Sequence, residues 1–360
     1  MHITYRTTTL GITNWRDGHH RNLRECEEEA AKLSKGFIPQ MKEYEEDDWA
    51  DKSRGIGWAG KDQFLDNPRC VFKELINDPT SGFATVDACG KIILNTTAMS
   101  ETLDRCNRLG LKIALLCLFT PGQSPRIKEF VDYRLVNGTM RGRNLFRDGT
   151  DVWLVNRRVK SETLVGHETF IPTKCYPRLS RLLEQYFFVI RPLEKELAYQ
   201  VYGKQAYQEY SDYAWVQGGE KITADRMYKE LEIFLHQYCE IKAGIQVYRQ
   251  LCVEIGRTFL GSEFEIVQDQ LELLSAQRGH SLRVEQAQYA PGVHHLPGMS
   301  SDLLLRYGRI SETWWEVLGL KPGQPPLLPL CQRAKSAGKA KDELLTMIRE
   351  LLEELKRIRE

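Results

Sequence analysis

Apolar residues recur with a helical period of about 3.6 over most of this chain, and this recurrence limits the possible fold more than any other feature. The stretch 100–119 shows it clearly, because its leucines and Ile113 form one buried set. A helix at 22–44 is expected to break at Gly36 and Pro39. Further helices are predicted at 67–76, 124–134, 176–190, 192–210, 222–240 and 245–260.

Prolines mark several of these helix boundaries. Asn67 is expected to cap one helix, with Pro68 at its first position, and Pro125 suits the first turn of the helix at 124–134. Pro192 is expected to stop the helix that covers 176–190, because proline inside a helix removes a backbone hydrogen bond.

One region departs from the helical period. Residues 143–156 contain two strand-like runs around Asp148-Gly149, a dipeptide typical of hairpin turns. A third strand is expected at 167–172, and residues 1–19, which show no period, are expected to form a flexible or strand-like arm. The sequence therefore predicts a mainly α protein with a small antiparallel β-sheet.

Length and turn signals divide the chain. A length of 360 residues suggests two domains, and the turn that starts at Thr120 marks a boundary. We expect a helical N-terminal domain at 1–118 and a second domain at 119–320. Residues 321–360 begin with a proline-rich linker, and the leucine stripe of 341–360 predicts a helix that docks on this protein or on another chain.

Composition argues against several classes of protein. The chain has no run of about eighteen apolar residues, so no membrane span is expected. Residues 1–13 lack the basic-then-apolar order of a secretory signal. The nine cysteines are scattered without a C-x-x-C pair, which indicates reduced, mostly buried thiols in an intracellular protein.

The net charge of +1 hides an uneven distribution. Residues 120–191 contain thirteen basic and seven acidic residues, whereas 25–51 contain ten acidic residues and three lysines. A basic middle of this kind fits a protein that presents one positive face to phosphates. Two solvated faces of opposite sign would explain the same counts.

Three other patterns are interpreted as structural. Gly55–Gly60 matches a dinucleotide-binding motif but follows a polar turn, not a strand, so a loop is expected. His236 and Cys239 supply only half of a zinc-binding spacing. We predict no metal and no cofactor, and the two adjacent histidine pairs are interpreted as surface pairs: His19-His20 and His294-His295.

A different set of residues suits phosphoryl transfer between DNA strands without a metal. That reaction needs a nucleophile, two guanidiniums that hold the non-bridging oxygens, and an acid that protonates the leaving 5′ oxygen. Taken singly, each candidate also suits an ordinary surface or core position. The chain offers the groups in this order: Arg126 with Glu129 behind it, Lys160 at a hairpin end, Arg249 at a helix start, and His280 nine residues before Tyr289.

The order of these residues resembles that of the tyrosine recombinases, which break and rejoin DNA. The segment from Arg126 to Arg134 is similar to the first motif of that family, R-I-S-E followed by apolar positions and a second basic residue. Gly279-His-Ser through Tyr289 resembles its L-G-H-S…Y motif. The segments around it look most like those of fungal mobile-element recombinases of the Crypton type: 277–281, 296–304 and 314–320.

The resemblance implies a site-specific DNA recombinase, with the tyrosine-recombinase catalytic fold joined to a helical DNA-binding domain. A 3′-phosphotyrosine would form on the nucleophile, and neither ATP nor a metal would be required. The implied roles are nucleophile for Tyr289, phosphate clamp for Arg126 and Arg249, orientation of Arg126 for Glu129, general acid for Lys160 and assistance for His280.

The second motif departs from the family pattern. Gln246 stands where the family usually has histidine, and glutamine cannot exchange a proton at neutral pH. The step from Arg249 to His280 is also longer than usual, which implies an insertion around 261–272. Arg257 therefore stays open as the second clamp residue.

Double-stranded DNA is the implied partner, bound by a homo-oligomer (a dimer or a tetramer), and a eukaryotic host would place the protein in the nucleus. Three other classes stay open: a type IB topoisomerase, a catalytically silent DNA-binding relative of the recombinases, and a purely structural helical protein. The residues expected to contact the DNA backbone are Arg141, Arg143, Arg157, Arg158 and Lys174.

Overall fold

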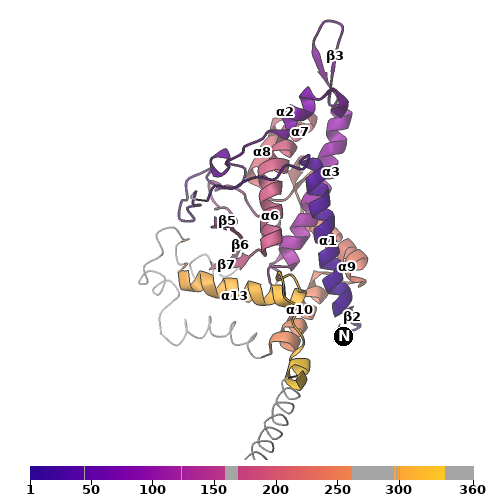
Figure 1. The fold of residues 1–360 in the computed structure, drawn as a ribbon, viewed down its shortest axis with the longest axis vertical. Helices are drawn as coiled ribbons and strands as arrows, with labels where there is room; N and C mark the ends of the chain where they lie inside the picture. Colours follow the sequence, from indigo (N-terminus) through magenta and orange to yellow (C-terminus); the bar gives the residue numbers. More distant parts are fainter. Residues whose placement is uncertain are drawn as a thin grey trace, which may run out of the picture.

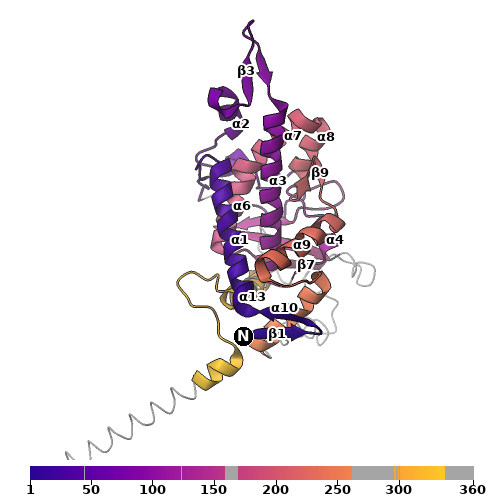
Figure 2. The same cartoon turned by 90° about the vertical axis from the view of Figure 1, so that its right-hand side faces the viewer.

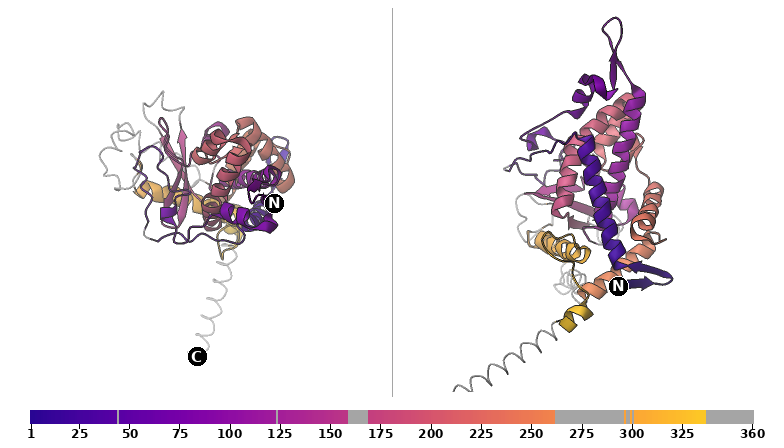
Figure 3. Two further views of the ribbon diagram at one scale, coloured as in Figure 1. Left: turned by 90° about the horizontal axis from the view of Figure 1, so that it is seen from above. Right: turned by 45° about the vertical axis from the view of Figure 1, so that its right-hand side comes forward.

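The structure is a computed structural model that describes residues 1–43, 45–122, 124–158, 169–261, 296, 299 and 301–336. Helices dominate it, and the strands form small antiparallel sheets, as the sequence predicts. Seen from above, the three-stranded sheet lies to one side of the main helices (Figure 3). Among the helices of these residues, none combines the length and apolar character that crossing a membrane requires. The helix predicted at 341–360 lies outside the described residues.

The chain begins with a hairpin that leads directly into a long helix. β1 (His2–Tyr5) pairs with β2 (Thr8–Gly11), so the strand-like alternative for the arm is confirmed there. The helix, α1 (Ile12–Leu33), begins ten residues before the expected Asn22, so that boundary was wrong. Its first three turns bury Trp15 and His19. Because a histidine stands at one of the buried positions, the apolar period is hard to recognise in the sequence there.

His19 is part of the core, so the interpretation of His19-His20 as a surface pair is wrong for its first member. Its ring lies 5.5 Å from that of Trp15, 5.7 Å from Phe119 and 5.3 Å from Phe234, measured between centroids. Burial lowers the pKa of His19 to about 3, so the ring is neutral at pH 7. The pair His294-His295 lies outside the described residues.

Of two predicted helix boundaries in this region, one is confirmed and the other shifts because a backbone N–H takes the expected capping group. α1 ends at Leu33, and the N–H of Gly36 (φ 74°) donates to the carbonyl of Ala31, so the expected break at Gly36 is confirmed. Asn67 does not cap a helix. Its Oδ1 accepts from the N–H of Gln40 at 2.7 Å, and α2 (Val71–Asn77) begins four residues later.

The helix predicted at 100–119 is α3 (Thr96–Phe119), which the Asn95 side chain caps by accepting from the N–H of Ala98. Before it, β3 (Ala84–Val86) and β4 (Ile92–Leu94) form a hairpin. This hairpin projects from one end of the molecule (Figures 1 and 2). Two short 3₁₀ turns, η1 and η2, lie at Asp62–Phe64 and Pro79–Ser81.

The predicted hairpin and third strand are confirmed. β5 (Leu145–Asp148), β6 (Asp151–Arg158) and β7 (Thr169–Lys174) form one antiparallel sheet in that order, and Gly149 takes φ 56° in the turn. Helix α13 (Ser301–Leu318) lies against β7. A small second apolar cluster contains residues of the sheet, of α13 and of two preceding segments: Trp49, Phe146, Trp153, Val155, Leu296, Met299 and Leu304.

Pro192 does not stop the helix that precedes it, so that prediction is wrong. α6 (Pro177–Gln185) continues through a π-helical turn at Tyr186–Ile190 into α7 (Arg191–Tyr202). In a π turn the backbone hydrogen bonds join residues five apart instead of four. This change occurs just before Pro192, whose missing N–H would otherwise interrupt the α-helical hydrogen bonds. α8 (Lys204–Asp212) follows after Gly203.

The last two predicted helices of the body are confirmed within two residues at each end. They are α9 (Ala224–Cys239), which Thr223 caps, and α10 (Ile245–Leu260). A two-stranded ribbon, β8 (Val216–Gln217) and β9 (Glu220–Lys221), connects α8 to α9.

The main core joins elements from both sides of the predicted boundary at 118/119. One hydrophobic cluster extends from Ile3 to Leu320; α1 packs on α9, and α3 packs on α7. This shared core shows no separation at 118/119, so the division into two domains stays a prediction. Six of the nine cysteines are buried and all nine are free, as expected; the exposed ones are Cys70, Cys89 and Cys331.

Gly18 tests this shared core. A Cβ at Gly18 of α1 would lie 2.1 Å from the carbonyl oxygen of Tyr238 in α9. Gly18→Ala should therefore lower the free energy of unfolding by about 1–3 kcal/mol in urea titrations, although alanine normally stabilises a helix interior. Gly11→Ala is the control, since its Cβ would meet only Asn14 at 3.6 Å. Equal stability of the two variants would contradict the close approach of α1 and α9.

Candidate functional site

The segment that carries Arg126 contains a single helical turn, not the helix predicted at 124–134. α4 spans Ile127–Phe130, Arg126 precedes it in an extended conformation, and Pro125 lies outside it. Beyond α4, the backbone pairs with a distant segment instead of continuing the helix. The N–H of Leu135 donates to Asp212, and the carbonyl of Tyr133 accepts from Ala214.

Arg126 and Glu129 lie on one face, as their spacing predicts. Arg126 Nη1 lies 3.4 Å from Glu129 Oε1, and the Nδ2 of Asn156 donates to Glu129 Oε2 at 3.0 Å. The Arg126 side chain is 39% exposed and that of Glu129 is 15% exposed. Glu129 is thus held from β6 on one side and faces the guanidinium of Arg126 on the other through one long contact, which leaves most donors of Arg126 available to an anion.

Asn156 was missed in the sequence. It occupies a strand position between the apolar Val155 and the basic Arg157, and it is 8% exposed. A buried amide in a short strand needs polar partners, and this need was a usable signal. The sequence alone did not indicate that Glu129, twenty-seven residues earlier, is that partner.

Arg249 lies on a helix that is fixed to the end of α3. Its neighbour Tyr248 is buried, with its ring centroid 4.6 Å from that of Phe119, and its hydroxyl accepts from Trp15 Nε1 at 3.2 Å. Arg249 itself is exposed, and within the described part of the chain no acidic side chain pairs with it. Arg257, by contrast, pairs with Glu254 at 2.9 Å.

Three of the predicted catalytic residues lie outside the described residues: Lys160, His280 and Tyr289. The described strand β6 ends at Arg158, two positions before Lys160. Gln246, at the family's usual histidine position, is exposed on the first turn of α10.

Arg143 is completely buried, so its side chain is not open to a DNA backbone. Its Nη1 pairs with Asp47 Oδ1 at 2.7 Å, its Nη2 donates to the carbonyl of Asp48, and its guanidinium stacks on Phe146. The prediction of a backbone contact at this position is therefore wrong. The acidic stretch near Asp47 folds back onto the hairpin and neutralises this charge there.

Other members of the predicted basic face are also engaged within the protein. Lys174 pairs with Asp151 at 2.8 Å and Glu312 at 3.1 Å; burial opposes its charge, but these hydrogen bonds outweigh burial and raise the pKa of Lys174. Arg157 donates through Nε and Nη2 to the carbonyl of Arg143. Both positions are thus poorly placed for phosphates.

Two of the predicted backbone contacts stay predictions. Arg141 keeps an exposed side chain (58%) and lies 3.4 Å from Asp132. Arg158 is the last residue of β6.

No family model matches the chain, and no solved structure matches it. Any functional proposal for this protein therefore rests on its own residues and their arrangement.

Asp47 tests whether Arg143 is a structural residue. Asp47→Ala leaves a buried guanidinium without its counter-ion, which should lower the free energy of unfolding by about 3–5 kcal/mol in urea titrations. Asp66→Ala removes an exposed carboxylate without an ion pair in the described structure and should change it by less than about 0.5 kcal/mol. If Asp47→Ala were as stable as the wild type, Arg143 would be free to move to a ligand.

Proposed function

We propose that this protein is a DNA-breaking and DNA-rejoining enzyme of the tyrosine-recombinase class, from a mobile element. Tyr289 attacks a backbone phosphate, its oxygen bonds to phosphorus, and the bond to the 5′ oxygen breaks. Lys160 protonates that oxygen, while the phenol proton of Tyr289 passes to the His280 imidazole or to solvent as the new bond forms. The energy of the phosphodiester bond is kept in the 3′-phosphotyrosine. The 5′ hydroxyl of another strand can therefore attack this phosphorus, release Tyr289 and form a new phosphodiester bond without ATP or a metal.

The observation that carries this proposal is the chain of contacts from Asn156 through Glu129 to Arg126. A guanidinium that clamps a phosphate needs a fixed orientation, because each donor must meet a particular oxygen. Glu129, which Asn156 holds from its far side, is placed to give Arg126 that orientation when a phosphate binds. An arginine with only a structural role would be buried or saturated, as Arg143 is, whereas Arg126 is partly open to solvent.

The surroundings of Arg126 support the other assigned roles. β6 carries Asn156 and ends at Arg158, so the proposed acid Lys160 follows in sequence, by two residues, the strand that holds Glu129. α10 presents Arg249 without a competing acid in the described structure, and Tyr248 fixes that helix to the end of α3. This difference favours Arg249 over Arg257 as the second clamp residue.

We propose that the substrate is double-stranded DNA, that two or four copies of the protein assemble on it, and that the protein acts in the nucleus if its host is eukaryotic. The proposal also assigns the recombinase fold to the chain, with two DNA-binding domains divided at 118/119. Because α1 and α3 share a core with α7 and α9, the two proposed domains would have to enclose DNA with surfaces that lie outside that core.

The nucleophile is testable with a nicked suicide duplex that traps the covalent intermediate. Wild-type protein should form a protein–DNA adduct that migrates slowly on a denaturing gel, and Tyr289→Phe should form none, because phenylalanine has no attacking oxygen. Tyr199→Phe, at an exposed tyrosine of α7, should keep the adduct.

The same assay, together with DNA-binding and DNA-relaxation measurements, also distinguishes the alternative functions. Absence of an adduct in the wild type, with salt-dependent DNA binding retained, would replace the proposal by a catalytically silent DNA-binding protein. An adduct with relaxation of supercoiled DNA and no site preference would indicate a type IB topoisomerase. An adduct that survives Tyr289→Phe would remove Tyr289 as the nucleophile.

The second clamp residue is testable in the same assay. Arg249→Ala should slow adduct formation roughly 10²–10³-fold, the usual loss for one donor that stabilises transition-state charge. Arg257→Ala should have a much smaller effect, because Arg257 is paired with Glu254. The reverse order of the two effects would assign the clamp to Arg257.

A further inference from the structure

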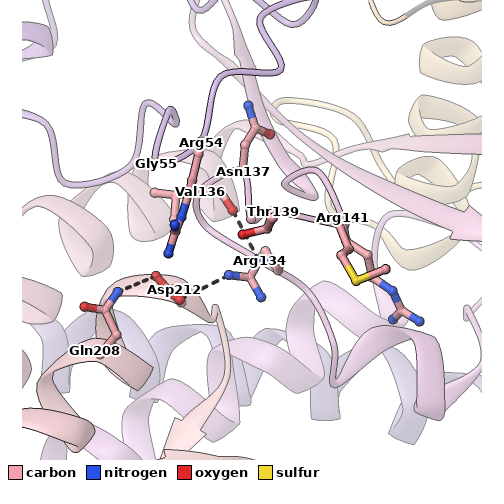
Figure 4. Close-up of a pocket in the computed structure, with 11 residues that line it drawn as sticks. Arg54, Gly55, Arg134, Val136, Asn137, Thr139, Arg141, Gln208 and Asp212 are labelled. Carbon is pink, nitrogen blue, oxygen red and sulfur yellow. Dashed lines mark hydrogen bonds and ion pairs between the residues drawn. The ribbon is translucent and has the colours of Figure 1, made fainter.

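A pocket of about 420 Å³ lies between the loop that contains Arg54, the loop that follows α4, and α8. Figure 4 shows side chains from all three segments around it. Three arginines and a single aspartate line it: Arg54, Arg134, Arg141 and Asp212. An excess of guanidiniums in a concave, mostly polar site favours an anion over a cation or an apolar ligand.

The aspartate does not cancel this charge for an incoming ligand. Asp212 accepts from Arg134 Nη2 at 3.1 Å through one oxygen and from Gln208 Nε2 at 2.8 Å through the other. Both oxygens are thus engaged with the protein. Arg54 is exposed and makes no ion pair with any described residue, and Arg141 is only loosely paired with Asp132, at 3.4 Å.

Arg134 is held in place with donors to spare. Its guanidinium lies over the ring of Tyr213 at 4.7 Å, and its Nε points at the carbonyl of Val136 at 3.4 Å. A guanidinium has five N–H groups, and Nη1 of Arg134 has no hydrogen-bond partner in the described structure. A fixed arginine with free donors loses little freedom when it binds an anion.

The backbone of the pocket is also fixed before a ligand arrives. The N–H of Gly55 donates to the carbonyl of Asn137, and the N–H of Asn137 donates to the carbonyl of Ile56, both at 2.8 Å. The side chain of Asn137 donates to the carbonyl of Asp51 at 2.7 Å. The two loops that carry Arg54 and Arg134 are therefore tied together.

We propose that this pocket binds a phosphate group, and that in the DNA complex it holds a second backbone phosphate beside the one clamped by Arg126. The pocket and Arg126 flank the same short segment: Arg126 directly precedes α4, and Arg134 lies four residues after the end of α4. The DNA source of the phosphate rests on the proposed function. The capacity to bind phosphate rests on the three arginines alone.

The test compares two doubly substituted proteins with the same charge change. Arg54→Gln with Arg141→Gln alters the pocket at exposed side chains and leaves the contacts of the half-buried Arg134 in place. Arg24→Gln with Arg108→Gln is the control, at exposed arginines of α1 and α3 that form no ion pair with described residues. Binding to a fluorescently labelled random-sequence duplex is measured by anisotropy over a series of KCl concentrations.

The pocket variant should bind the duplex more weakly, and its plot of log K against log [KCl] should be shallower by about 1, since each phosphate contact contributes a slope of about −0.9. The control should change the slope by less than half as much. A second arm measures the melting temperature in inorganic phosphate and in KCl of equal ionic strength. A stabilisation by phosphate that the pocket variant loses, with an unchanged slope, would indicate a free phosphate compound as the ligand.

If neither the salt dependence nor the phosphate stabilisation differs between the two double variants, the pocket is not a phosphate site. This outcome is independent of catalysis. If the wild-type protein forms no covalent adduct but the two double variants differ in salt slope, the recombinase proposal fails and the pocket proposal stands. If the wild-type protein forms the adduct but the two double variants do not differ, the recombinase proposal stands and the pocket proposal fails.

Discussion

The packing around Phe119, the last residue of α3, holds together the elements that surround the candidate site. Its ring lies 5.1 Å from that of Phe234 in α9 and 4.6 Å from that of Tyr248 in α10, and its carbonyl accepts from the indole N–H of Trp314 in α13. Protein interiors are close-packed, so a change in one of these helices would move the others. Arg126 follows Phe119 by seven residues and Arg249 follows Tyr248 directly, so the geometry of both proposed clamp residues depends on this cluster.

Charge pairing inside the protein changes the meaning of the uneven charge distribution. The acidic segment 25–51 and the basic segment 120–191 do not form two separate solvated faces throughout; Arg143 pairs with Asp47, and Arg178 pairs with Glu27. These pairs remove charge that the sequence counts as available to DNA. In the proposed DNA complex, affinity for phosphates comes from a few guanidiniums in defined places, such as Arg126 and Arg249, more than from a diffuse positive field.

Prediction succeeded where local signals were strong and failed where distant contacts overrode them. The hairpin at Asp148-Gly149 and helices α9 and α10 follow from turn chemistry and apolar period. The helix expected at 124–134 shrank to one turn, because its backbone pairs with residues near Asp212. Pro192 was misjudged, because a π-helical turn accommodates it.

The sequence by itself determined the mainly helical architecture, the place of the small sheet, and the relation of Arg126 to Glu129, since all three depend on residues close together in the chain. Only the tertiary structure decided which basic side chains are open to a ligand. Arg143 and Arg126 look alike as letters, but one meets Asp47 in the core and the other meets Glu129 near the surface. That difference comes from partners far away in sequence, and the helical period carries no information about them.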